Sequence, residues 1–190
     1  MFVRIKKIKG IPYAYLVKNT WKKGKTIQKT VKYLGRVIGV KPLSESLDLS
    51  LDSMSSPKDL FYSLVNKQLL ALGFKPKNKT VYFNKELNVE FNFRSLSFKQ
   101  QNKNCVLKLN DGFVCDHNLK RLRKVIEGSV SCRDEDFYDS GKELARALVD
   151  LGFILQKDQF QKLIFGILKL REENSKKISI NSEFESNKKS

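Results

Sequence analysis

The stretch FVRIKKIKGIPYAYLVKNTWKKGKTIQKTVKYLGR, residues 2–36, is the most informative part of the sequence about the N-terminal fold. It is rich in Val, Ile, Thr and Tyr, and Gly, Pro and Asn interrupt these residues at short intervals. This pattern is typical of strands joined by turns, because β-branched and aromatic side chains favour extended backbone. We therefore predict a small antiparallel meander of three strands. They are expected at about residues 2–9, 13–18 and 26–34, with a loop at 19–25.

The same stretch carries most of the positive charge. The chain of 190 residues has 37 Lys and Arg, 20 Asp and Glu, and a formal net charge of +17. Residues 1–41 contain 12 of the basic residues and no acidic residue, and the first acid is Glu45. Like charges crowded on one surface weaken the folded state, so this segment is expected to bind a polyanion, most simply a nucleic acid. A solvated lysine-rich surface without a partner is the alternative.

Aromatic residues alternate with these bases. Tyr13, Tyr15 and Tyr33 are expected in the core of the meander, because so small a sheet needs its large side chains for burial. Trp21 lies in the predicted polar loop, where its indole could stack on nucleic-acid bases or insert between them. A meander this small is also expected to dock on the rest of the chain or on a second copy. The bases of this segment expected to contact phosphates are Lys6, Lys7, Lys9, Lys22, Lys23, Lys25, Lys29, Lys32 and Arg36.

The segment resembles the basic N-terminal β element of DDE-type insertion-sequence transposases. Those proteins have a Tyr-x-Tyr-Leu-Val-like strand followed by a Gly-Lys…Gln-Lys…Lys-Tyr-Leu-Gly strand. The resemblance implies a small basic element that contacts DNA, but not transposition, because that family's catalytic domain needs more chain than 190 residues. The whole chain resembles small uncharacterised archaeal proteins that join such an N-terminus to an α+β body. The matching residues are Tyr13, Tyr15, Leu16, Val17, Gly24, Lys25, Gln28, Lys29, Lys32, Tyr33, Leu34 and Gly35, all within residues 1–36.

Composition divides the chain into four parts. Residues 1–41 form the basic meander, and residues 42–56, PLSESLDLSLDSMSS, have the composition of a linker. Residues 57–171 carry the apolar patterns of an α+β body. Residues 172–190 are mostly Lys, Glu, Ser and Asn, which predicts a disordered tail.

The body is expected to combine an antiparallel sheet with about four helices. Ser56 and Pro57 predict the start of one helix and Gly73 its end. A capping box, Ser140 with Glu143, predicts the start of another. Alternating apolar residues predict strands at about 80–84, 87–94, 96–99, 105–109 and 113–115, and amphipathic patterns predict further helices at about 118–126 and 158–171.

The predicted helix at 118–126 carries a second basic group. Its apolar residues form an inner face, and its bases point outward, where Arg can hold phosphate through two hydrogen bonds. A helix-turn-helix is not expected, because residues 127–139 are too long for its turn. A solvated face is the alternative. The bases expected to extend the phosphate contacts are Lys120, Arg121, Arg123 and Lys124.

Patterns for metal binding and nucleophilic catalysis are weak. Cys105, Cys115, His117 and Cys132 are residue types that bind zinc, but their spacing lacks the short Cys pair of zinc sites. Buried free thiols are therefore expected. A Cys115–His117 dyad is not expected to act as a nucleophile, because the two residues are only two positions apart.

One acidic cluster allows a different reading. Asp134, Glu135, Asp136 and Asp139 precede a predicted helix, where acids stabilise the helix dipole. Paired carboxylates also hold Mg²⁺ in nucleases, so a cryptic nuclease is a further alternative. The chain has no phosphate-binding loop and no dinucleotide or zinc-protease motif, so no cofactor, no metal and no catalytic residues are expected.

These patterns predict a non-enzymatic nucleic-acid-binding protein. Duplex DNA is favoured over RNA by the transposase-like stretch, and lysine-rich contacts imply low sequence specificity. The alternative is a protein-binding adaptor or a ribosome-associated RNA-binding protein, and a homodimer is open. No apolar run approaches about 18 residues, and no secretory signal is present. With only three Cys, the protein is expected in the cytoplasm, without a membrane partner.

Overall fold

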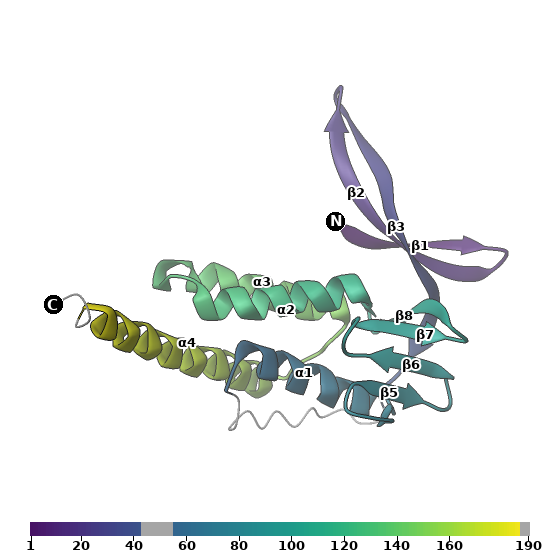
Figure 1. Ribbon diagram of the computed structural model, residues 1–190. Coiled ribbons are helices and arrows are strands. Elements are labelled where there is room, and N and C mark those ends of the chain that lie inside the picture. The colour runs from purple at the N-terminus through teal and green to yellow at the C-terminus, as the bar shows by residue number, and fades with distance from the viewer. Residues whose placement is uncertain (43–54, 187–190) are drawn as a thin grey trace.

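The computed structural model describes residues 1–42 and 55–186, with side chains as far as Ser175. In these residues nine strands form one mixed sheet beside four α-helices, which confirms the α+β class (Figure 1). The sheet order is β1-β2-β3-β8-β7-β6-β5-β4, and β9 pairs with β8. The strands are β1 (Phe2–Ile8), β2 (Ile11–Lys22), β3 (Lys25–Val40), β4 (Lys75–Pro76), β5 (Val81–Asn84), β6 (Val89–Asn92), β7 (Ser97–Gln100), β8 (Lys103–Leu109) and β9 (Gly112–Val114). The helices are α1 (Pro57–Ala71), α2 (Asp116–Ser131), α3 (Phe137–Leu151) and α4 (Lys157–Ser186), with a 3₁₀ helix η1 (Asp134–Asp136) before α3.

The predicted meander is present, but two of its strands are longer than expected. β1 pairs with β2 and β2 with β3, both antiparallel. Lys9–Gly10 closes the first hairpin and Lys23–Gly24 the second, and all four residues have positive φ. Two-residue turns of this kind match the right-handed twist of strands. The loop predicted at 19–25 is therefore wrong, because strand pairing continues to Lys22 and Lys25.

β3 joins the meander to the body. We expected this strand to end near Gly35, but it continues to Val40, and residues 36–40 pair in parallel with β8. Gly35 has φ +126°, and a Cβ there would lie 2.1 Å from the carbonyl oxygen of Asn104. Only glycine allows this conformation at such close approach. The meander therefore docks on the rest of the chain, as expected, by sharing one sheet with it.

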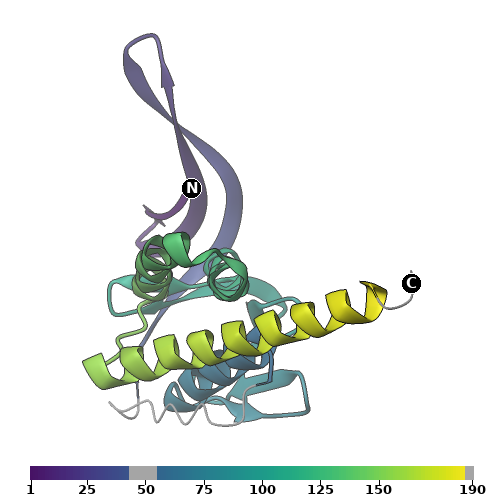
Figure 2. The ribbon, with the colours of Figure 1, turned by 90° about the vertical axis from the view of Figure 1, so that its left-hand side faces the viewer.

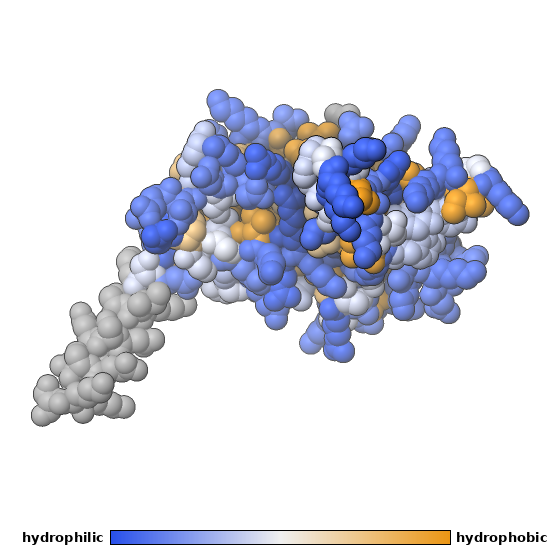
Figure 3. Space-filling view, turned by 90° about the horizontal axis from the view of Figure 1, so that it is seen from above, coloured by the Kyte–Doolittle hydropathy of each residue, from blue (hydrophilic) through white to orange (hydrophobic). Residues whose placement is uncertain are grey.

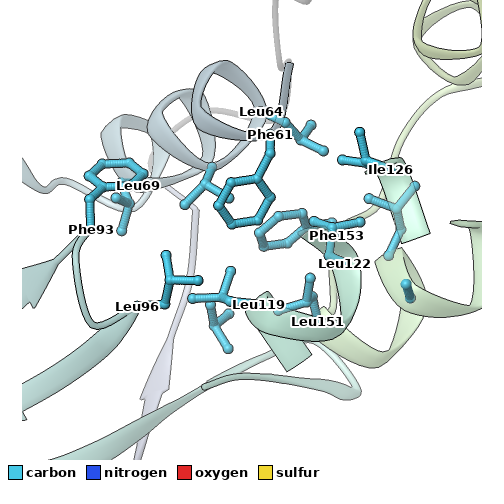
Figure 4. Packing of buried hydrophobic residues seen from close by; sticks show 14 of the residues in the cluster. Phe61, Leu64, Leu69, Phe93, Leu96, Leu119, Leu122, Ile126, Leu151 and Phe153 are labelled. Carbon is cyan, nitrogen blue, oxygen red and sulfur yellow. The ribbon is translucent and has the colours of Figure 1, made fainter. Parts of the chain in front are cut away.

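The main core lies between the body sheet and the helices (Figures 1 and 4). The helices lie together on one side of this sheet, whereas the outer end of the β2–β3 hairpin projects away from both (Figures 1 and 2). In Figure 4, Phe61 of α1 and Phe153, which follows α3, point toward one another above Leu119 of α2. Burial of these large side chains holds α1, α2 and α3 to each other and to the sheet.

The first helix is capped as predicted, but α3 begins earlier than predicted. The Ser56 hydroxyl accepts a hydrogen bond from the Asp59 backbone N at 3.1 Å, and Gly73, with φ +79°, follows the end of α1. The capping box at Ser140 is wrong, because α3 already begins at Phe137, directly after η1. The Ser140 hydroxyl instead shares a hydrogen bond with Ser129 and so joins α3 to α2.

The C-terminal helix is longer than the pattern predicted. We expected a helix at about 158–171 and a disordered tail from 172, whereas α4 continues to Ser186 and extends past the body (Figure 2). Residues 167–186 contain no Gly or Pro to end a helix. The last four residues, 187–190, lie outside the described part. So does most of the linker predicted at 42–56, because residues 43–54 are not described.

Candidate nucleic-acid interface

The outer half of the β2–β3 hairpin stands free of the body. Every residue from Lys18 to Tyr33 is exposed, whereas Leu16 and Val17 just before it are buried. We call residues 18–33 the arm. It contains six lysines and no acid. Figure 3, which views the molecule from above, shows hydrophilic side chains over most of this side of the protein.

Strand register gives the arm one face dominated by lysine. Lys18 lies opposite Lys29, and Lys22 lies opposite Lys25. Thr20 and Ile27 lie opposite each other between these two pairs. We call the four lysines the lysine face. Like charges directly opposite each other on paired strands destabilise the pairing. Within the described residues none of the four lysines has an acidic partner, so their repulsion is not offset inside the protein.

The opposite face of the arm is polar but uncharged. Asn19 lies opposite Gln28, and Trp21 lies opposite Thr26, and we call these four residues the amide face. Gln28 Nε2 donates to Asn19 Oδ1 at 3.2 Å, and Gln28 Oε1 accepts from Arg4 Nη1. Trp21 is 74% exposed, and it lies on β2 rather than in the loop predicted for it. The arm therefore presents cations on one side and amide groups with an indole on the other.

The three tyrosines are not in the core, which corrects our expectation. Tyr33 is half exposed, and its ring centroid lies 6.2 Å from that of Tyr13 and 5.4 Å from that of Tyr15. Lys6 Nζ lies 5.3 Å from the centroid of the Tyr15 ring. Partial burial, with the neighbouring tyrosines, raises the pKa of Tyr33. The other face of the meander is the one that packs on the body, through Ala14, Leu16, Leu34 and Val37 against Val106 and Cys115.

The predicted bases of residues 1–41 fall into separate groups. Lys22, Lys23 and Lys25 lie at the tip of the arm, whereas Lys9 lies in the turn at the other end of β2. Lys29 and Lys32 lie along the arm, and Lys32 Nζ contacts Asp116 Oδ2 at 2.6 Å. Lys6 and Lys7 are exposed on β1, and Arg36 is exposed where β3 passes from β2 to β8.

The bases predicted on α2 are largely engaged by acids. Arg121 pairs with Glu143 at 3.1 Å and also with Asp150. Arg123 pairs with Glu127 at 2.8 Å, and this hydrogen bond raises the pKa of the guanidinium. Lys120 Nζ lies 3.8 Å from Asp116, whereas Lys124 is exposed and has no acidic partner in the described residues. The positive charge of α2 is therefore mostly balanced within the body.

Cys105 and Cys115 lie in surroundings that suppress the reactivity of their thiols. Burial raises the pKa of Cys105 to about 12 and that of Cys115 to about 11, so both stay protonated near neutral pH. Burial also lowers the pKa of His117. In residues 1–42 and 55–186, no three His, Cys, Asp or Glu side chains come together as metal ligands would.

The acidic cluster before α3 is tied up in ion pairs. Asp134 pairs with Arg171 of α4, and Glu135 and Asp136 both pair with Arg133, at 2.8 and 3.2 Å. Asp139 accepts from Lys142 at 3.0 Å. These contacts explain the cluster as a connection around the start of α3, with each carboxylate already paired to a cation.

Some residues of the candidate interface were not predicted from the sequence. Lys18, Asn19 and Thr26 were assigned to no site, because the second strand was expected to end at Lys18 and to be followed by a loop. The sequence does contain a signal for a continuous hairpin, because the Lys23–Gly24 pair can form a two-residue turn between segments of equal length. Lys-Gly is a weaker turn signal than Asn-Gly, so the pattern did not stand out.

Comparisons of the chain with protein-family models, curated proteins and solved structures found no match. Among the helices of the described residues, none has the length and apolarity to cross a membrane. The function is therefore inferred from the chemistry of the arm.

Proposed function

We propose that this protein is a non-enzymatic nucleic-acid-binding protein that grips duplex DNA with the arm. The observation that supports this most directly is the lysine face. In each of two cross-strand pairs one lysine lies directly opposite another, on an exposed ribbon whose sequence contains no acid. Their repulsion destabilises the free arm, and it is relieved when the ammonium groups bind phosphate groups and counterions are released.

The shape of the arm favours duplex DNA over duplex RNA. Two paired strands lie about 4.8 Å apart, and the major groove of B-DNA, about 12 Å wide, admits such a ribbon. The major groove of A-form RNA is too narrow and deep for it. Lysine contacts phosphate as a point charge, so these contacts bind with low sequence specificity. Lys120 and Lys124 of α2 extend the contact beyond Lys32 at the base of the arm.

The proposal places the protein in the cytoplasm. Cys105, Cys115 and Cys132 are free thiols, two of them buried, as is usual in a reducing compartment that also holds nucleic acid.

Salt-dependent binding tests the proposal. We would measure the fluorescence anisotropy of a labelled DNA duplex with the full chain at several salt concentrations. The logarithm of affinity should fall with the logarithm of salt concentration, by about 0.9 for each phosphate contact. Lys18→Gln with Lys29→Gln should reduce this slope by about 2, because it removes one lysine pair. A flat salt response of the native chain would overturn the proposal.

A matched control keeps the total charge change equal. Lys75→Gln with Lys85→Gln removes two exposed lysines at the opposite end of the sheet, around β4 and β5. This variant should keep the native slope, and equal losses in both variants would mean that net charge alone acts. Structured RNA and single strands serve as competitors. If RNA competes as well as duplex DNA, the RNA-binding alternative replaces the proposal.

A further inference from the structure

The amide face of the arm has the groups that proteins use to read bases. Asn19 and Gln28 lie side by side across the two strands, and Arg4 reaches Gln28 from β1. Asn and Gln form paired hydrogen bonds with the N6 and N7 atoms of adenine in the major groove, and Arg does so with O6 and N7 of guanine. These three exposed side chains need no such arrangement to fold, because water would satisfy them equally well.

The existing hydrogen bonds orient the side chains of the amide face and leave further hydrogen-bonding groups unused. Gln28 donates to Asn19 and accepts from Arg4, so the three planar groups are connected in a row. The Asn19 amide nitrogen still has two donors, and the Arg4 guanidinium has further N–H groups. Fixing the side chains in advance lowers the conformational entropy that binding would otherwise lose.

The lysine face is compatible with this orientation. In each pair one lysine belongs to β2 and the other to β3, so the two stand at opposite edges of the ribbon. The major groove is about 8.5 Å deep, so a ribbon with its amide face toward the floor carries the lysines near the groove rims. Each lysine of a pair then lies beside the phosphates of the strand on its own side.

Resting on the proposed function, we propose that the amide face reads base edges in the major groove, with Asn19 and Gln28 contacting adenine and Arg4 contacting an adjacent guanine. The lysine face then supplies sequence-independent affinity, and the amide face adds a sequence preference to it. Trp21 lies on the same face, two residues nearer the tip than Asn19, so in this orientation its indole also faces the bases.

Selection from a library of random DNA duplexes tests this assignment. The full chain should enrich one or two adenine positions, and Asn19→Ala with Gln28→Ala should lose the enrichment while keeping the salt slope. Replacing an enriched adenine by 7-deazaadenine removes the N7 acceptor and keeps base pairing. This should weaken native binding about fivefold or more and leave the variant unchanged.

A control on the other face completes the test. Thr20→Ala with Ile27→Ala alters the uncharged cross-strand pair between the two lysine pairs and should keep the enrichment. A native chain that binds with a steep salt slope but enriches no position would overturn the base-reading role alone. Loss of enrichment in the Thr20 and Ile27 variant instead would assign reading to the side of the arm on which the lysine face lies. A native chain without salt-dependent binding would overturn the proposed function itself.

Discussion

The arm and helix α2 both carry several bases in a short stretch, but they differ in what surrounds those bases. On α2, Arg121 is held by Glu143 and Asp150, and Arg123 by Glu127. On the lysine face, by contrast, each cation faces another cation. A base that is already paired with an acid must give up that partner before it binds phosphate. An unpaired base gives up only its bound water, and phosphate binding relieves its repulsion with the neighbouring cation. We therefore expect unbalanced charge, rather than the number of bases, to mark the proposed nucleic-acid contact.

The two regions also differ in how firmly they are joined to the rest of the fold. α2 contributes Leu119, Leu122 and Ile126 to the main core, whereas residues 18–33 are exposed throughout. The arm meets the body at its base, where Lys32 contacts Asp116 and β3 passes Gly35 to pair with β8. Changes at the tip should therefore affect binding without affecting folding, and changes at the base should do the reverse.

Gly35→Ala at the base of the arm is expected to have the largest effect. Its Cβ would lie 2.1 Å from the Asn104 carbonyl oxygen, at a φ of +126°. We expect the free energy of unfolding to fall by roughly 3 kcal/mol or more, because neither backbone is free to move away. Urea denaturation measures this. Gly39→Ala on the same strand, where a methyl group meets nothing within 4 Å, should change stability by less than about 1 kcal/mol. Equal effects of the two substitutions would mean that the close approach of Gly35 to Asn104 does not stabilise the junction between the arm and the body.

Shortening the arm comes next. Residues 19–28 would be replaced by Asn-Gly, which joins the paired Lys18 and Lys29 through a two-residue turn. Because Lys22, Lys23 and Lys25 are lost, we expect the affinity for duplex DNA to fall roughly a hundredfold and the salt slope by about 2.7. The midpoint of thermal unfolding should stay nearly unchanged, since every removed residue is exposed. Anisotropy and calorimetry measure the two quantities, and unchanged affinity would place the contact elsewhere.

The smallest effect is expected from Arg121→Gln on α2. It removes the ion pairs to Glu143 and Asp150, which are partly exposed, so stability should fall by less than about 1 kcal/mol. Its DNA affinity should stay within about twofold of the native value, whereas Lys22→Gln, with the same charge change, should reduce the salt slope by about 0.9. A larger slope change in Arg121→Gln than in Lys22→Gln would reverse the comparison between the two regions.

Local patterns explain why much of the fold was predictable. The strands of the meander follow from β-branched and aromatic runs, and the start of α1 follows from Ser56 and Pro57. Alternation in the body also predicted strands at about 105–109 and 113–115, which correspond to β8 and β9. Each of these features depends on residues a few positions apart, so the sequence alone carries it.

The rest of the candidate site depends on contacts between distant segments. The two faces of the arm follow from the register of β3 with β2, which shifts at two irregularities, one between Ala14 and Tyr15 and one between Leu16 and Val17. The partners of Arg121 lie 22 and 29 positions away in the sequence. The tyrosines point outward because the other face of the meander meets Val106 and Cys115 of the body. No local pattern contains this information.

Two properties follow directly from the order of residues: positive charge is concentrated in residues 1–41 without an acid, and this segment is built of strands. Which bases lack an acidic partner depends on how the chain packs. Ion pairs form wherever folding brings an acid near a base, and folding did this for Arg121 and Arg123 but left Lys18, Lys22 and Lys29 on a ribbon beyond the reach of the acids in the described body. Net charge is a property of composition, whereas unbalanced charge at a surface is a property of packing.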